Sequence, residues 1–324
     1  MSLKDISIQI NNAEKIGITY HVSPDGDAVG SALGLLNGLR ALGKDVYLIS
    51  KDIISDSLQY LKSADEGDGE TIVPTKDTDM VVVLDCGNYE RISADLKKFR
   101  GELVNLDHHV TNDYYGDINY VDIKAAATAE IVFELLELLG MDFNEKTEAT
   151  LEVGTCLYTS IVTDTGAFRH SNVTFRTHTI AARLKKIGVN NTFIYTSLFD
   201  NKSFNKMKLI GKALTDMELL LDNKVALIQI TESLVKELGL LNHDTSDIIS
   251  FGLQIKGVEV AVLIKEAEDG AKASLRSKND FNVRKIAESL GGGGHIKAAG
   301  IKIKDVNIDQ ARDMILQAIE SAMN

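Results

Sequence analysis

The stretch Glu102-Leu103-Val104-Asn105-Leu106-Asp107-His108-His109 joins a short apolar run to one acid and two imidazoles. The apolar run predicts a buried β-strand, and the polar triplet follows at its end. Charged and hydrogen-bonding groups are costly to place at the end of a buried strand unless something binds them. Asp107, His108 and His109 are therefore the first candidates for a functional site.

Three other apolar segments of the chain end in acidic or imidazole side chains. His21-Val22-Ser23-Pro24-Asp25-Gly26-Asp27 follows the apolar residues 17–20, and Asp85 follows the run 80–84. Asp164 ends the apolar stretch 150–163, which we expect to be helical. Ligands of open α/β sheets bind outside the carboxyl ends of the strands, so these side chains are expected to meet.

Strand-like and helix-like segments alternate through the first 125 residues. We expect strands at 17–20, 45–49, 80–84 and 102–106, and a helix at 28–42. The continuous apolar, β-branched run at 80–84 is typical of a strand buried on both faces. This alternation predicts a parallel sheet with helices on both faces. Farther along, we expect helices at 127–139, 150–163, 178–186, 204–221, 283–290 and 309–323, and strands at 225–230, 258–264 and 271–275.

A chain of 324 residues can form two domains, each with its own core. We expect an α/β protein with an N-terminal domain at 1–190, a helical linker at 191–222 and a smaller α/β domain at 223–324. The active site is expected in the cleft between the two domains. The boundary rests on a change of pattern, because no linker rich in proline, glycine and serine is present.

Composition narrows the class of protein. A net charge of −12 argues against a broad basic face for long nucleic acids, although metals and a few arginines can still bind a short anionic substrate. The two cysteines, Cys86 and Cys156, form no disulfide framework. No apolar run approaches ~18 residues, so no transmembrane helix is expected. The start of the chain lacks a signal-peptide pattern, which favours a cytoplasmic location.

The acids and imidazoles at these segment ends are suited to metal binding. Asp25 and Asp27 place two carboxylates two residues apart in what reads as a tight turn, and His21 adds a nitrogen donor. A mixed nitrogen and oxygen ligand set suits Mn²⁺, Fe²⁺, Zn²⁺ or Co²⁺ better than Ca²⁺. Each motif alone could be an ordinary turn or terminus, but their joint occurrence favours a metal site.

Candidates for substrate binding lie in the C-terminal half. Arg276 and Lys278 follow a predicted strand, and arginine suits bidentate phosphate recognition. The glycines at 291–294 precede His295, and consecutive glycines let backbone N–H groups approach an anion. The same glycines could simply end the helix at 283–290. We include Gly293 and Gly294 as substrate contacts, together with Phe168 and Arg169 from the segment after Asp164.

In this order, the motifs resemble those of the DHH/DHHA1 phosphoesterases over nearly the whole chain. The matching segments are 21–31, Asp85, the triplet Asp107-His108-His109, 163–166, 274–277 and the glycine-rich 292–300. The resemblance implies two Mn²⁺ ions, for which Mg²⁺ or Co²⁺ could substitute. It implies that one ion is held by His21, Asp25 and Asp85, and the other by Asp27, Asp85, His108 and Asp164. His109 would face the substrate phosphate, and Asp107 would orient an imidazole.

The resemblance also implies a reaction, the hydrolysis of a phosphate ester without a covalent intermediate. The two-domain architecture is similar to the group that cleaves short oligonucleotides (nanoRNA) from the 3′ end and converts pAp to AMP. Short RNA or DNA and pAp are the expected substrates, with cyclic di-AMP or pApA as the alternative. A RecJ-like single-strand DNA exonuclease and a non-catalytic nucleotide sensor are less favoured, because the chain has no added domain and its ligand set is intact. We also expect a homodimer.

Overall fold

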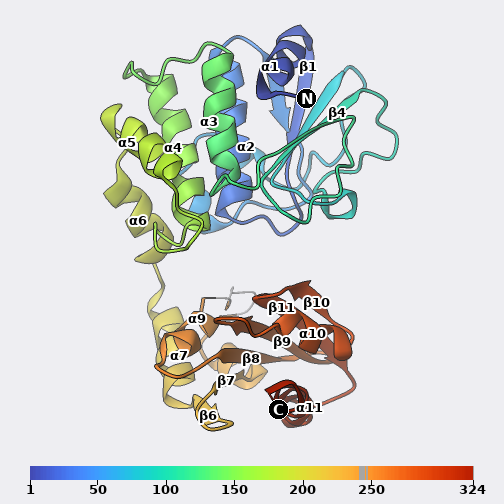
Figure 1. The fold of residues 1–324 in the computed structure, drawn as a ribbon, viewed down its shortest axis with the longest axis vertical. Coiled ribbons are helices and arrows are strands. Elements are labelled where there is room, and N and C mark those ends of the chain that lie inside the picture. Colours follow the sequence, from blue (N-terminus) through green and yellow to red (C-terminus); the bar gives the residue numbers. More distant parts are fainter. Residues whose placement is uncertain (241–244, 246, 324) are drawn as a thin grey trace. The chain divides into compact units, whose positions relative to one another are not determined.

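The structure is a computed structural model that describes residues 1–240, 245 and 247–323. The chain divides into two compact units, Met1–Asn201 and Lys202–Asn324 (Figure 1). Among the described residues, no helix is both long enough and apolar enough to cross a bilayer.

The N-terminal unit is built on a five-stranded sheet in the order β2-β1-β3-β4-β5. All neighbouring strands are parallel, which confirms the predicted α/β class and parallel sheet. Because β1, β3 and β4 are neighbours, the residues that follow them gather at one edge of the sheet. The last strand, β5, is an addition to the predicted set. The strands are β1 Lys15–Thr19, β2 Asp45–Leu48, β3 Met80–Leu84, β4 Glu102–Asp107 and β5 Ile118–Val121.

Helices cover one face of this sheet (Figure 1). The side chains of Ile18, Val82 and Val104 on that face share a core with the helices. The helices α2 and α4 pack closely, because a Cβ at Gly30 would lie only 2.6 Å from the carbonyl oxygen of Cys156. The helices of this unit are α1 Leu3–Asn12, α2 Gly26–Ala41, α3 Thr128–Leu138, α4 Glu148–Asp164, α5 Phe175–Lys186 and α6 Asn191–Phe199, of which α5 and α6 pack against other helices.

The other face of the sheet lacks the helical layer that the sequence predicts. Val81 and Val83 on that face pack against Cys86, Ile92 and other loop residues of the segment that joins β3 to β4. That segment contains a short 3-10 turn at Tyr89–Arg91 but no α-helix. Ile92, Leu96 and Phe99 recur at helical spacing in this segment, yet they pack against the sheet from loops.

The C-terminal unit has a mixed six-stranded sheet in the order β10-β11-β9-β8-β7-β6. In the described part of this unit, β7 and β8 are parallel neighbours and the other strand pairs are antiparallel. The predicted long helix at 204–221 is wrong in its last third, because α7 ends at Thr215 and β6 follows at Glu218–Leu220. The strands are β6 Glu218–Leu220, β7 Val225–Ile230, β8 Val260–Ala267, β9 Gly270–Ser277, β10 Gly293–His295 and β11 Ala298–Lys304. The helices are α7 Phe204–Thr215, α8 Glu232–Glu237, α9 Ile249–Gln254, α10 Val283–Ser289 and α11 Ile308–Met323.

Candidate metal centre

Asp25 and Asp27 lie at the start of α2 rather than in the tight turn expected from the sequence. Asp25 is the N-cap of the helix, and its carboxylate accepts hydrogen bonds from the backbone N–H groups of Asp27 and Ala28. Asp27 lies in the first helical turn and is almost fully buried. Both carboxylates therefore lie at the partially positive N-terminus of the helix.

Asp85 follows β3 and occupies the centre of the site. Its backbone is left-handed, with φ of 53°, and its N–H donates to the carbonyl of Leu106 on β4. The carboxylate is buried, with 2% exposure. Its two oxygens face different neighbours. Oδ2 lies 3.6 Å from His21 Nε2, and Oδ1 lies 3.5 Å from His108 Nε2.

Two sets of potential ligands therefore meet at Asp85. In the first set, His21 Nε2 lies 3.9 Å from Asp25 Oδ1 as well as near Asp85. The second set surrounds His108, whose Nε2 is 3.5 Å from Asp27 Oδ2 and 3.7 Å from Asp164 Oδ2. The structure thus brings together all six side chains that the sequence proposes as metal ligands. Their oxygen and nitrogen donors suit first-row divalent cations.

The two imidazoles of these sets are oriented by backbone carbonyls. His21 Nδ1 lies 2.9 Å from the carbonyl oxygen of Val22, and His108 Nδ1 lies 3.1 Å from that of Ala125. Each carbonyl accepts the Nδ1 proton, which leaves Nε2 as the lone-pair donor that faces the carboxylates. This arrangement is the usual one for metal-binding histidines.

His109 and Asp107 form a separate pair beside the two ligand sets. Asp107 is fully buried at the end of β4 and accepts a hydrogen bond of 2.7 Å from His109 Nδ1. The other carboxylate oxygen accepts from the side chain of Asn112 at 2.6 Å. His109 Nδ1 also lies 3.6 Å from Asp85, but the bond to Asp107 occupies that nitrogen. The half-buried imidazole of His109 is left with Nε2 for a substrate.

Sequence reasoning missed several residues that hold the carboxylates in place. Thr128, at the start of α3, donates its N–H to Asp27 Oδ2 at 2.9 Å and its hydroxyl to Asp85 Oδ1 at 3.0 Å. Asp27 also accepts from the hydroxyls of Ser31 and Ser160. Ser31 could have been found, because it lies one helical turn after Asp27. Thr128 and Ser160 carry no local signal, since they meet Asp27 only through the fold.

The ionisation of the site reflects crowded negative charge. Burial, followed by the nearby Asp85 carboxylate, raises the pKa of Asp27 well above its ordinary value. Burial likewise raises the pKa of Asp164 to about 6. Burial also disfavours charge on His108, but its hydrogen bond to Asp85 and the surrounding carboxylates outweigh this effect and raise its pKa to about 11. Burial opposes the charge of Asp85 too, yet hydrogen bonds from His108 and His21 lower its pKa.

Comparison with known proteins agrees with this geometry. Residues 15–161 match the model of the DHH family, N-terminal domain, and residues 222–324 match the DHHA1 domain. The chain belongs to the DHH family. It is 33% identical to the bifunctional oligoribonuclease and PAP phosphatase NrnA of Thermus thermophilus, over 95% of this chain and 90% of that protein. The NrnA of Bacillus subtilis is 30% identical over 93% of this chain and 92% of that protein.

Two further relatives extend the comparison. The cyclic-di-AMP phosphodiesterase GdpP of Geobacillus thermodenitrificans is 27% identical over 96% of this chain, which spans about half of that protein. The crystal structure of an exopolyphosphatase-related protein from Bacteroides fragilis superposes with a TM-score of 0.90 and 26% identity, over 98% of this chain and 95% of that one. As a DHH family member, this protein is a phosphoesterase. The enzymes of this family depend on metal ions, in keeping with the ligand sets around Asp85.

The proposed substrate residues of the DHHA1 domain lie on or next to β9 and β10. Arg276 is half-buried on β9, and its guanidinium donates to the carbonyl of the adjacent Leu275. Lys278 follows the same strand, with its ammonium 3.4 Å from the carbonyl of Ile255. Gly293, Gly294 and His295 form β10, which pairs with β11.

Packing accounts for part of the glycine-rich segment. Gly294 has a φ of 142°, and a Cβ there would lie 2.5 Å from the carbonyl oxygen of Ala298. A Cβ at Gly293 would meet nothing within 4 Å, and this residue is exposed. Gly294 is therefore required by the β10–β11 hairpin, whereas Gly293 has no such structural requirement.

Phe168 and Arg169 lie in the N-terminal DHH domain, close to the end of α4. The ring of Phe168 stacks on His178 with a centroid distance of 5.5 Å, and it packs against the main core. Arg169 donates to the carbonyl of Gly166. These contacts give Phe168 a packing role that is independent of any substrate.

Proposed function

We propose that this protein is a two-metal, Mn²⁺-dependent phosphoesterase that hydrolyses short oligonucleotides from the 3′ end and converts pAp to AMP and phosphate. The observation that carries the proposal is the position of Asp85, whose two oxygens each face a different set of potential ligands. A carboxylate in this position suits two cations that share one ligand. The likeness to two NrnA proteins supports the choice of substrates.

The assignment of ligands follows the two sets. One ion would be held by His21 and Asp25, and the other by Asp27, His108 and Asp164. Asp85 would be a ligand of both ions. Four aspartates supply four negative charges, which two divalent cations would balance. When bound, such a pair of ions lowers the pKa of a shared water and stabilises charge on the phosphoryl oxygens.

The remaining side chains act on the substrate or on the ligands. His109 would donate a hydrogen bond from Nε2 to the phosphate or to the leaving oxygen, since Nδ1 is engaged by Asp107. Burial disfavours a charged His109, but its bond to Asp107 outweighs this effect and raises its pKa, which favours the donor form. Thr128, Ser31 and Ser160 would hold the carboxylates at their positions. In the DHHA1 domain, Arg276 and Lys278 would bind substrate phosphates, with Gly293, Gly294 and His295 beside them.

The substrate panel that tests this proposal contains pAp, a dinucleotide, a 5-mer RNA, pApA and cyclic di-AMP. Rates should be measured with Mn²⁺, Mg²⁺ and Co²⁺, with Asp85→Asn as the inactive control. We expect turnover of pAp and of the short RNAs with Mn²⁺, and 3′-end cleavage of the 5-mer. Hydrolysis of cyclic di-AMP or pApA alone would reject the proposal in favour of the alternative, which the likeness to GdpP supports. The expected homodimer and cytoplasmic location stay predictions.

A further inference from the structure

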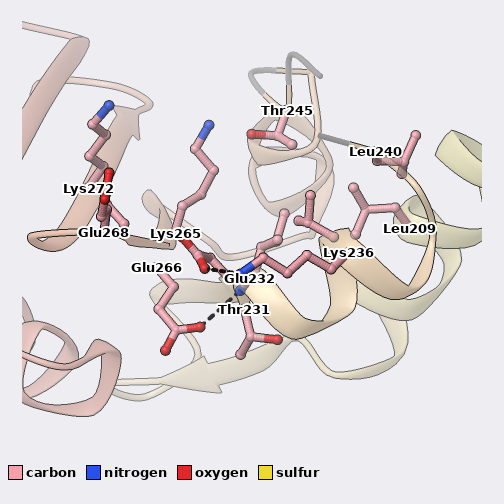
Figure 2. Close-up of a pocket in the computed structure, with 13 residues that line it drawn as sticks. Leu209, Thr231, Glu232, Lys236, Leu240, Thr245, Lys265, Glu266, Glu268 and Lys272 are labelled. Carbon is pink, nitrogen blue, oxygen red and sulfur yellow. Dashed lines mark hydrogen bonds and ion pairs between the residues drawn. The ribbon is translucent and has the colours of Figure 1, made fainter. Parts of the chain in front are cut away.

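The C-terminal unit contains a pocket of about 330 Å³ between the β8–β9 hairpin and the helices α7 and α8 (Figure 2). Its charged side chains are Lys236, Lys265, Lys272, Glu232, Glu266 and Glu268. The lysines and glutamates balance, and Glu232 pairs with Lys236 at 2.6 Å, so the pocket indicates no particular class of ligand. More informative contacts lie in the N-terminal unit, next to the proposed metal ligands.

A short segment at residues 122–128, which runs from the end of β5 into α3, lies against the second ligand set. The carbonyl of Ala125 accepts the Nδ1 proton of His108 at 3.1 Å. The N–H of Ala125 donates to the carbonyl of Asp122, whose own N–H donates to the carbonyl of Asp107. The orientation of the His108 imidazole therefore depends on where this turn lies.

The end of the 122–128 segment holds two of the ligand carboxylates. Thr128 donates its N–H to Asp27 and its hydroxyl to Asp85. One imidazole and two carboxylates thus depend on the same few consecutive residues. A small shift of the segment would therefore move three of the proposed ligands at once.

Arg176 on α5 anchors the 122–128 segment to the helical layer. Its Nη1 donates to Asp122 Oδ2 at 2.5 Å, and its Nε lies 2.8 Å from Glu134 and 3.4 Å from Glu130 on α3. Within the described parts of the chain, these three carboxylates form ion pairs with Arg176 and with no other cation. One guanidinium therefore contacts both the start of the segment and the helix in which it ends.

Burial makes the positive charge of Arg176 important. The side chain of Glu130 is fully buried, and Arg176 itself is half-buried. Burial raises the pKa of Glu130, while a hydrogen bond from Thr177 and the charge of Arg176 oppose this rise. A buried carboxylate that loses its counter-charge is strongly destabilising. Without Arg176, the residues around the 122–128 segment would have to rearrange.

We propose that Arg176 is a positioning residue of the metal centre, which fixes the 122–128 segment and thereby holds His108 ready for a cation. It acts through Asp122 and α3 rather than on the substrate. Arginine suits this role, because its planar guanidinium presents several donors in a rigid fork and can face carboxylates from two elements. The inference rests on the proposed function, because it assumes a cation at the ligand set of His108.

The first ligand set should depend on Arg176 less. His21 is oriented by the carbonyl of Val22, and Asp25 is the N-cap of α2, so both side chains have supports of their own. Loss of Arg176 should therefore weaken one of the two cation sites more than the other. A general loss of stability would instead weaken both sites alike.

The matched control is Arg183, which lies about two turns after Arg176 on α5. It joins the same two helices, because its guanidinium donates to both carboxylate oxygens of Glu137 on α3. Glu137 lies near the opposite end of α3 from Thr128. Arg176→Met and Arg183→Met therefore remove the same kind of contact at the two ends of one helix.

The test measures Mn²⁺ binding to the full chain by calorimetry, and pAp hydrolysis as a function of Mn²⁺ concentration. For Arg176→Met we expect one site to lose about tenfold in Mn²⁺ affinity, the usual scale when a group that orients a ligand is lost. Turnover should fall at low Mn²⁺ and recover when Mn²⁺ is raised, with the KM for pAp unchanged. Arg183→Met should bind Mn²⁺ as the wild type does.

The inference is wrong if Arg176→Met and Arg183→Met bind Mn²⁺ equally well, or if both sites of Arg176→Met weaken by the same factor. Should Arg176→Met fail to fold, Asp122→Asn decides in its place. Asparagine keeps an oxygen for the N–H of Lys124 but removes the charge that faces Arg176. Weaker Mn²⁺ binding at one site then supports the inference, and binding like that of the wild type rejects it.

Hydrogen exchange of the metal-free protein separates failure of this inference from failure of the proposed function. If the wild type binds no Mn²⁺ and hydrolyses no pAp, the proposed function fails, and exchange still reports on the segment. The N–H groups of Asp122, Ala125 and Thr128 are hydrogen-bonded. They should exchange faster in Arg176→Met than in Arg183→Met, and equal rates would reject the role of Arg176.

Discussion

Replacing Asp107 with asparagine tests whether this residue orients His109 rather than binding metal. The carboxylate accepts hydrogen bonds from His109 Nδ1 at 2.7 Å, from Asn112 at 2.6 Å and from the backbone N–H of His108 at 2.8 Å. The distance of 2.7 Å between His109 Nδ1 and Asp107 is in the range of charge-assisted hydrogen bonds. A net value of about 1.5–3 kcal/mol for such a bond corresponds to a fall in kcat of about 10- to 150-fold, at 1.36 kcal/mol for each factor of ten.

The assay for Asp107→Asn is steady-state hydrolysis of pAp, with Mn²⁺ affinity measured by calorimetry. We expect kcat to fall as calculated and Mn²⁺ affinity to stay close to wild type, because the six ligands of the two sets are unchanged. Adding His109→Ala should cause little further loss, since both changes remove the same function. The reasoning would be refuted if the fall in kcat of the double variant equalled the product of the falls in the two single variants. A loss of Mn²⁺ binding in Asp107→Asn would refute it as well.

The other predictions concern the metal ligands, the hairpin and substrate recognition. Asp85→Asn should abolish turnover and weaken Mn²⁺ binding without changing the circular dichroism spectrum; substantial residual activity would exclude a shared ligand. In the metal-free protein, the pKa values of Asp27, Asp164 and His108 are raised, so these groups stabilise the fold at low pH and this stability is lost as the pH rises. For Asp164 the loss occurs between pH 3.8 and about 6. The melting temperature of the metal-free protein should fall between pH 4 and pH 8, and it should fall less steeply in the Asp164→Asn variant. Adding Mn²⁺ at pH 8 should restore the melting temperature. Gly294→Ala should destabilise the C-terminal unit by at least about 2 kcal/mol in urea unfolding, whereas Gly293→Ala should not; equal effects would contradict the packing argument. Arg276→Ala should raise the KM for nucleotides and leave an aryl phosphodiester unaffected, and equal losses would exclude a recognition role.

The proximity of the proposed metal ligands could be predicted from the sequence because the strand order decides which strand ends lie next to each other. His21, Asp85 and His108 each come shortly after one of three neighbouring parallel strands, so their proximity needs only the topology. We expected Asp25 in a tight turn, but its N-cap position could have been read from the sequence, since aspartate before an apolar helix is a common N-cap. What the sequence could not show was Thr128, which meets Asp27 across 101 residues.

Errors in the predicted fold have similar physical causes. The second face of the N-terminal sheet is covered by loops, although Ile92, Leu96 and Phe99 recur there at the spacing of a helix. In the C-terminal unit, the stretch Ile301-Lys302-Ile303-Lys304 alternates between apolar and charged residues, a strand signal that the small residues before it obscured. Phe168 shows a different limit, because an aromatic ring next to a site can be a substrate contact or a packing residue. Its stacking on His178 and its contact with the main core, which the sequence does not show, favour packing.

The proposed metal centre would couple the stability of this fold to its chemistry. Asp27 and Asp85 are buried side by side, and without cations His108 is the main group that offsets their charge. A protonated His108 cannot ligate, so metal binding must displace its proton and take over its electrostatic role. Metal affinity should therefore rise with pH over the range in which the metal-free protein loses stability. Both effects have one cause, the excess of buried carboxylates over positive charge that the polypeptide itself provides.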